Sequence, residues 1–164
     1  MFADNKSETE CCPKFDPIPW DGQEIIWCDK LFIKDTVPQL FHIPLPGILP
    51  KKISAMWNKI EAAGAKPENK DFLMLMSESS QWKGEVYISV TKEISEAENI
   101  KLSGTYLTRV FDGAYNNIPK WIKEMESYVS QKGKSVKNYY FYHTTCPKCA
   151  QKHGHNYTVV FAEV

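Results

Sequence analysis

Two segments of this 164-residue chain match each other without a gap, and this internal repeat restricts the fold more than any other feature. Residues 50–64 and 119–133 each begin with a proline and end with a glycine. Proline suits the first turn of a helix, and glycine suits the left-handed position that follows the last turn. The repeat therefore predicts two helices with defined ends.

Each predicted helix carries apolar side chains at helical spacing, so each has one face to bury. These side chains are Ile53, Met56, Trp57 and Ile60 in the first helix and Ile118, Ile122, Met125 and Val129 in the second. The same alignment places Phe72 opposite Phe141, each at the start of a strand-like segment. A strand is expected after each helix.

Further strand-like segments lie before the helices, at residues 37–43 and 104–111, and after them, at residues 85–90 and 156–161. The sequence therefore predicts an α+β fold of two strand-helix-strand-strand repeats, about residues 31–92 and 100–164. We expect one antiparallel sheet with both helices on one face and a groove at the pseudo-twofold axis, where ligands usually bind.

Length and composition fit one domain over residues 31–164. Residues 11–20 contain three prolines, which disfavour a helix or a central strand. We therefore expect residues 1–30 to form an extended arm packed on the domain.

The charges exclude some classes of partner. Twenty basic residues balance twenty acidic ones, so neither nucleic acid nor an anionic membrane surface is an expected partner. The sequence lacks an apolar run of roughly 20 residues and a secretory signal, which predicts a cytoplasmic protein with reduced cysteines. A small molecule is the expected partner, and the oligomeric state is not predicted.

Residues 104–121 resemble one family in particular. They look like the second lead strand, the Gly-x-Tyr turn at Gly113 and Tyr115, and the helix start of GyrI-like domains, which are named for a DNA gyrase inhibitory protein. The resemblance runs from about Phe32 to Val164. Relatives are ligand-sensing domains of multidrug-responsive regulators, stand-alone binders, and hydrolases that open cyclopropane rings in DNA-alkylating natural products.

The resemblance implies an apolar, aromatic central pocket with a buried acid. This chain departs from the family pattern in its cysteine-rich arm and its Cys-x-x-Cys hairpin, and it has no DNA-binding segment. Regulation of transcription by this chain alone is therefore not expected.

The strand around residues 82–90 supplies the candidate acid. Alternation places Glu85, Tyr87 and Ser89 on one face of the strand and Val86, Ile88 and Val90 on the other. In the groove, Glu85 would act as a general acid or base or accept a cationic ligand; facing water, it would be a surface carboxylate. The candidate ligand-binding residues are Trp82, Glu85, Tyr87, Tyr106 and Tyr157, although each ring could equally pack in the core.

The hairpin cysteines Cys146 and Cys149 have the spacing of half a zinc site. The other half could come from Cys11 and Cys12, or from the histidines at positions 143, 153 and 155. The same pair could instead cycle through a disulfide or simply pack. His42, within an apolar strand, is typical of a hydrogen-bonded core histidine.

Three functions remain open from the sequence. The first is a small-molecule-binding domain with an aromatic, acid-containing pocket. The second is a hydrolase of a reactive small molecule that uses Glu85. The third is a zinc or thiol-redox protein that uses the hairpin. No cofactor is required by these functions, and zinc is a possible one in the third.

Overall fold

The computed structural model describes residues 15–41, 43–144, 151 and 154–164. They fall into two compact units, which we name after their helices. The α1 unit comprises Ile26–Thr105, and the α2 unit comprises Tyr106–Val164 together with the residues up to Ile25. Two long strands, β1 (Gln23–Leu40) and β5 (Glu98–Asp112), contribute residues to both units.

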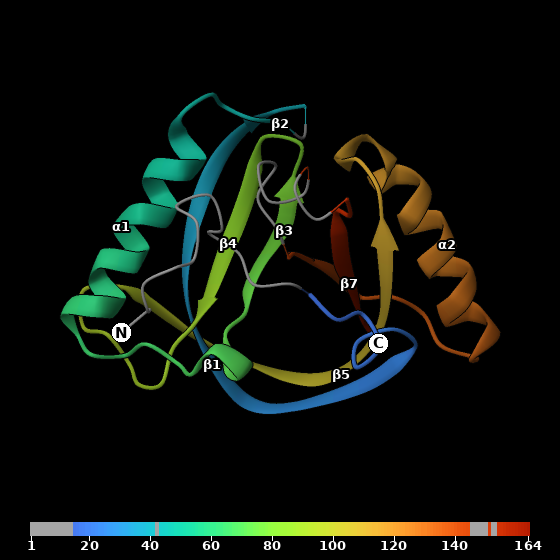
Figure 1. Cartoon of the computed structure of the whole chain (residues 1–164), viewed down its shortest axis with the longest axis horizontal. Coiled ribbons are helices and arrows are strands. Elements are labelled where there is room, and N and C mark those ends of the chain that lie inside the picture. The colour runs from blue at the N-terminus through green and yellow to red at the C-terminus, as the bar shows by residue number, and fades with distance from the viewer. Residues whose placement is uncertain (1–14, 42, 145–150, 152–153) are drawn as a thin grey trace. The chain divides into compact units, whose positions relative to one another are not determined.

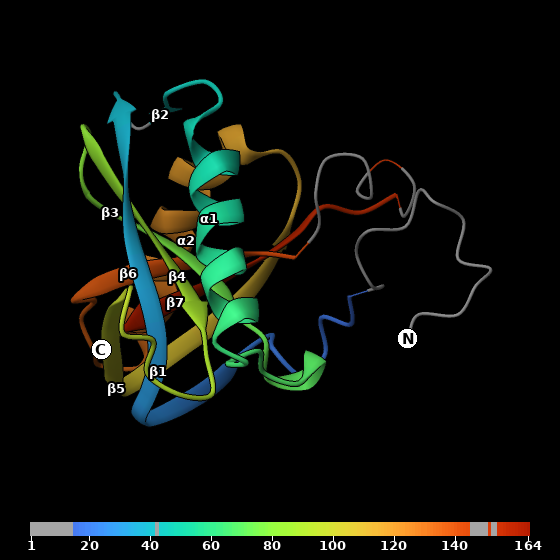
Figure 2. The same cartoon turned by 90° about the vertical axis from the view of Figure 1, so that its left-hand side faces the viewer.

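The α1 unit contains a sheet covered on one face by a helix. After β1 come the two-residue strand β2 (Ile43–Pro44), helix α1 (Ile48–Ala62) and a 3-10 turn (Asn69–Asp71). Strands β3 (Met74–Ser80) and β4 (Lys83–Ser89) follow, and β4 lies between β1 and β3, antiparallel to both. Helix α1 runs alongside these strands in both views (Figures 1 and 2).

The alternation of apolar and polar side chains along the strands explains which face of the sheet packs against α1. Met56 and Ile60 of the helix are buried in one cluster with β1 and β4 side chains. The strand residues in this cluster are Ile33, Val37, Val86 and Ile88, and Val90 directly after β4 joins them. The opposite face of β4 therefore carries Glu85, Tyr87 and Ser89, in agreement with the alternation predicted from the sequence.

The α2 unit has the same local order. β5 leads through a 3-10 turn (Tyr115–Asn117) into helix α2 (Ile118–Gln131), which is followed by β6 (Asn138–His143) and β7 (Tyr157–Glu163). β7 lies between β6 and β5, antiparallel to both. The helix buries Trp121, Met125 and Val129 against side chains of all three strands, and the Trp121 ring stacks on Phe111 at 5.4 Å.

The helix ends follow the predicted signals. Gly64 and Gly133, which come directly after the helix caps, have φ values of 62° and 71°. Pro119 lies in the first turn of α2, whereas α1 begins at Ile48, two residues before Pro50. Within the part of the chain that the structure describes, no helix is both long enough and apolar enough to cross a membrane.

The predicted open sheet with helices on one face and a groove at a pseudo-twofold axis is wrong. β1 spans 18 residues and β5 spans 15, far beyond the predicted lead strands 37–43 and 104–111. β1 pairs with β4 and also with β5, so the antiparallel sheet closes through this pairing instead of ending there. The sequence did not reveal these extensions because polar residues interrupt the apolar pattern in both strands. β1 begins at Gln23, within the range predicted as the N-terminal arm.

Candidate functional site

The candidate site lies on the face of the α1-unit sheet that points away from α1. Glu85 and Tyr87 stand there two residues apart on β4. In register with them on β1 are Thr36, opposite Glu85, and Lys34, opposite Tyr87. Antiparallel pairing therefore brings Lys34 beside the predicted acid, because directly opposed residues project to the same face.

Three polar side chains meet at this point. The Tyr87 hydroxyl donates a hydrogen bond to Glu85 Oε2 at 2.5 Å, and Lys34 Nζ lies 3.4 Å from Glu85 Oε1. The Lys34 ammonium is also 5.8 Å from the centroid of the Tyr87 ring. Each Glu85 oxygen thus has a partner from a different residue.

This cluster is largely shielded from water; Thr36 and Ser77 are opposite Glu85 on the adjacent strands, and apolar side chains surround Tyr87. The side chains of Glu85 and Lys34 keep only 13% and 18% of their surface exposed, and Tyr87 is buried. Phe32 on β1 packs its ring edge-on to Tyr87 at 6.3 Å, and Leu75 on β3 is opposite Tyr87 and fully buried. Taking two charges from water is costly unless they are paired, and these two are paired with each other.

This arrangement can move a proton. An ionised glutamate offers about four acceptor positions, so two contacts leave Glu85 able to accept a proton from a water molecule or donor group. The exposed part of its side chain allows a water molecule to reach it. Tyr87 and Lys34 restrict the orientation of the carboxylate, which a general acid or base requires.

Trp82 lies apart from this cluster. It occupies the turn before β4, is 49% exposed, and contacts the exposed ring of Phe41 at 5.0 Å.

The two remaining predicted aromatic residues lie in the α2 unit and at opposite ends of one strand pair. Tyr106 is opposite Glu163 at one end of the β5–β7 pair, and Tyr157 is opposite Asp112 at the other. Six residues of strand separate them, about 20 Å. Within this unit they do not line one small pocket together. Burial, with a smaller contribution from the Glu163 carboxylate, raises the pKa of Tyr106 well above its ordinary value.

Two described histidines have defined partners. His143 is largely buried beside Tyr115, and its Nδ1 lies 3.0 Å from Thr158 Oγ1; this burial lowers its pKa to about 4. His155 is half exposed, and its Nδ1 lies 2.7 Å from Asp112 Oδ2. Burial alone would raise the pKa of Asp112, but hydrogen bonds from Asn156 and His155 lower it overall.

The candidate metal ligands Cys11, Cys12, Cys146 and Cys149 lie outside the described residues, as do His42 and His153. Among the residues that the structure does describe, no group of three or more His, Cys, Asp or Glu side chains is placed to hold a metal ion. The zinc and redox interpretations of the hairpin stay predictions.

Lys34 was missed by sequence reasoning. The alternation Phe32-x-Lys34-x-Thr36 indicates that these three side chains share a face, but the sequence does not reveal which residue of β4 is opposite each of them. Register depends on strand pairing, and this pairing joins segments about 50 residues apart.

Several solved structures share this fold. The C-terminal domain of EcmrR matches with a TM-score of 0.65 and 12% identity, over 86% of this chain and 93% of that one. A hydrolase from Listeria innocua matches with a TM-score of 0.62 and 8% identity, over 88% and 92%. In a structure of an EcmrR–DNA complex, the EcmrR chain matches with a TM-score of 0.61 and 12% identity, over 86% of this chain but only 55% of that one. At these identities the comparison establishes the fold alone.

No curated protein sequence matches this chain. A protein-family model does match it: the model described as bacterial hydrolase aligns with residues 2–164. Together with the shared fold, this match supports the expected family resemblance broadly, and the family's description supports a hydrolase-like role. The chain belongs to the bacterial hydrolase family.

Proposed function

We propose that this protein hydrolyses a small apolar or aromatic molecule and that Glu85 is the catalytic acid and base. The observation that carries the proposal is the largely buried Glu85 carboxylate, held by Tyr87 and Lys34 on the sheet face away from α1. A glutamate side chain is almost never fully buried unless it is paired, and the largely buried Glu85 is paired with both Tyr87 and Lys34. Membership of a hydrolase family supports assigning chemistry to it.

The proposed reaction uses one water molecule. Glu85 takes a proton from the water while the water oxygen attacks an electrophilic carbon of the substrate, forming a C–O bond and breaking the bond to the leaving group. The protonated Glu85 then returns the proton to the leaving group, which restores the carboxylate. Tyr87 orients the carboxylate, and Lys34 offsets its charge in this largely buried position.

The contact with Lys34 also bears on the type of ligand. A site for a cationic compound would need an uncompensated carboxylate, but the Lys34 ammonium already lies 3.4 Å from Glu85. A cation would have to displace Lys34 at an electrostatic cost. The site therefore favours a neutral substrate over a cationic ligand that is bound without turnover.

The test measures turnover of a panel of 4-nitrophenyl esters and aryl epoxides by the full-length protein. Glu85→Gln, which preserves the shape of the side chain, should lower kcat by about 10²- to 10⁴-fold and leave KM within about threefold. Glu93→Gln is the matched control, because Glu93 is exposed in the same unit. Undiminished turnover by Glu85→Gln, or no turnover of the panel by the unmodified protein, would contradict the proposal.

A further inference from the structure

Most of the exposed apolar side chains in the described part of the chain gather at one end of the α1 unit. Eight large apolar side chains are exposed among the described residues, and five of them belong to two neighbouring turns. Leu40, Phe41, Ile43 and Leu45 lie in and around the β1–β2 hairpin, and Trp82 lies in the turn between β3 and β4. We call these five residues the apolar tip. Single exposed apolar residues are ordinary, but a contiguous group of them marks an interaction surface.

The two turns of the apolar tip are joined to each other. Leu40 is opposite Ile43 across the hairpin, so the two side chains project to the same face. The amide of Gln39 donates to the Trp82 carbonyl at 2.8 Å, and the ring centroids of Phe41 and Trp82 are 5.0 Å apart. Figure 1 shows both turns at the same end of the α1 unit.

The backbone of Phe41 adopts a conformation that phenylalanine rarely takes. Its φ value is 49°, at a position of the hairpin turn where glycine and asparagine are usual. A bulky side chain in this left-handed region is strained, and the 61% exposed ring packs too little to offset the strain. An exposed phenylalanine is therefore unfavourable here for the isolated protein, as expected of a side chain that has an external partner.

The charge around the apolar tip is mainly basic. Residues 37–52 and 79–84, which contain the tip, include Lys51, Lys52 and Lys83 but no acidic residue. The nearest carboxylates along β1 and β3 are Asp35, which Lys52 contacts at 3.3 Å, and Glu78. The neutral charge of the whole chain argued against an anionic partner, but the charge at this end of the unit is not balanced. The tip thus matches a partner that is both apolar and anionic.

The size of the apolar tip distinguishes between two such partners. Its five residues are 37% to 68% exposed, which at roughly 200 Å² for a large side chain gives on the order of 500 Å². A stable dimer buries about 800 Å² on each copy, and a symmetric contact would also place the lysines of one copy against the same lysines of the other. A bilayer with anionic headgroups has neither disadvantage, because it accepts apolar side chains at its boundary, tryptophan at the headgroup level and lysine near the phosphates.

We propose that the apolar tip docks this protein reversibly on the surface of an anionic lipid bilayer, with Phe41 and Trp82 as its aromatic anchors. Burial of the tip in the headgroup boundary supplies the apolar contribution, and the lysines beside it supply the electrostatic one. Docking does not involve Glu85, so it holds or fails independently of the proposed hydrolysis.

The first experiment measures sedimentation of the full-length protein with vesicles of equal parts phosphatidylglycerol and phosphatidylcholine. Asparagine tolerates the left-handed conformation, so Phe41→Asn should leave stability to urea unchanged or raised while it weakens vesicle binding about tenfold. Ile26→Asn is the matched control, because Ile26 is 73% exposed near the other end of β1. It should leave binding unchanged.

The second experiment tests the charge of the partner. Lys51→Gln should weaken binding to the mixed vesicles about fivefold, and the unmodified protein should bind vesicles of pure phosphatidylcholine more weakly than the mixed ones. Lys101→Gln, an exposed lysine on β5 in the same unit, should leave binding unchanged. Equal binding to the two kinds of vesicle would overturn the assignment of an anionic surface.

The third experiment locates the anchor by quenching of tryptophan fluorescence with lipids brominated in their acyl chains. Quenching should occur in the unmodified protein and largely disappear in Trp82→Phe. Glu85→Gln should sediment with vesicles as the unmodified protein does, which separates docking from turnover. Absence of vesicle binding, equal binding by Phe41→Asn and the unmodified protein, undiminished quenching in Trp82→Phe, or a dimer in solution that Phe41→Asn dissociates would each overturn the proposal.

Discussion

The Tyr87 hydroxyl donates a hydrogen bond to the carboxylate of Glu85, which precedes it by two residues on β4. Side chains two apart on a strand project from the same face about 6.6 Å from each other, so the tyrosine must lean along the strand to reach. Lys34 reaches the same carboxylate from β1. The contact with Tyr87 thus follows from the geometry of β4 itself, whereas the contact with Lys34 depends on the pairing of β4 with β1.

Replacing Tyr87 with phenylalanine tests the first partner. Tyr87→Phe keeps the ring that packs against Phe32 but removes the donor to Glu85. We expect a loss of about 1 kcal/mol in the free energy of unfolding and a fall of about tenfold in kcat. Urea denaturation and turnover of the ester panel measure the two effects. An unchanged kcat would show that Tyr87 does not position Glu85.

The charge pair is tested by a double-mutant cycle. Lys34→Met leaves the Glu85 carboxylate without its cation and should lower the free energy of unfolding by about 2 kcal/mol, less than for a fully buried pair because both side chains keep some exposure. Combining it with Glu85→Gln removes the unpaired charge and should recover most of that loss. Additive effects in urea denaturation would mean that the two charges do not interact.

Acid should destabilise the protein through His143, whose pKa is lowered to about 4 by burial. In the unfolded chain this histidine takes up a proton near pH 6.5, but in the folded chain only near pH 4, so stability falls as the pH drops between these values. The loss reaches about 3 kcal/mol at pH 4 relative to pH 7. His143→Gln should flatten this part of the curve of unfolding free energy against pH, and an unaltered curve would refute the assignment.

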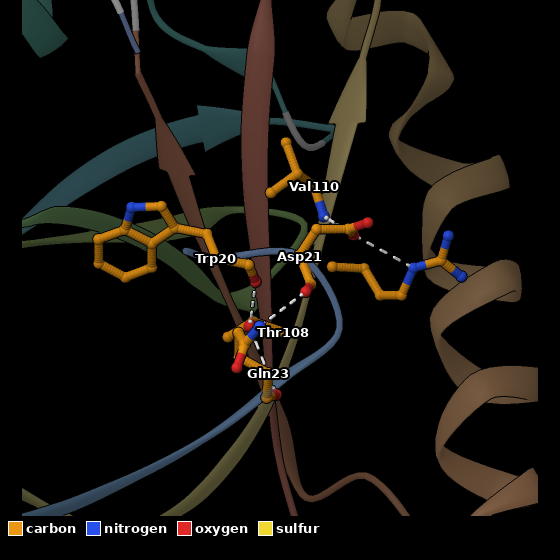
Figure 3. Close-up of polar contacts among 6 residues, drawn as sticks. Trp20, Asp21, Gln23, Thr108 and Val110 are labelled. Atoms are coloured by element: carbon orange, nitrogen blue, oxygen red, sulfur yellow. Dashed lines mark hydrogen bonds and ion pairs between the residues drawn. The ribbon is translucent and has the colours of Figure 1, made fainter. Parts of the chain in front are cut away.

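The contact between Thr108 and the N-terminal segment offers a further test. Thr108→Val keeps the shape of this fully buried side chain and removes the hydroxyl that donates to Trp20 O (Figure 3). We expect a loss of about 1 kcal/mol in unfolding free energy and faster exchange of the Trp20 and Asp21 amides, which donate to Pro17 O. Thr105→Val, on the same strand, is the matched control and should change neither quantity appreciably. Equal behaviour of the two variants would mean that Thr108 does not hold the segment around Trp20.

Short-range patterns in the sequence determined where the helices end and which side chains share a face of a strand. Gly64 and Gly133 have the left-handed conformation expected after a helix, because only glycine adopts it without steric cost. The alternation from Glu85 to Val90 was sufficient to separate the face packed on α1 from the face that carries Glu85 and Tyr87. Both properties arise from residues a few positions apart.

Only the tertiary structure decided which strands pair and which side chains meet across them. The β1–β5 pairing that closes the sheet, the approach of Lys34 to Glu85, and the position of Trp20 against Phe161 all join segments far apart in the sequence. Alternation excludes a register shift of one residue, which would turn every side chain to the other face, but it does not decide which strands pair or exclude shifts of two residues. The sequence alone therefore determined the helices and the face on which Glu85 lies, whereas the approach of Lys34 to Glu85 and of Trp20 to Phe161 came from long-range contacts.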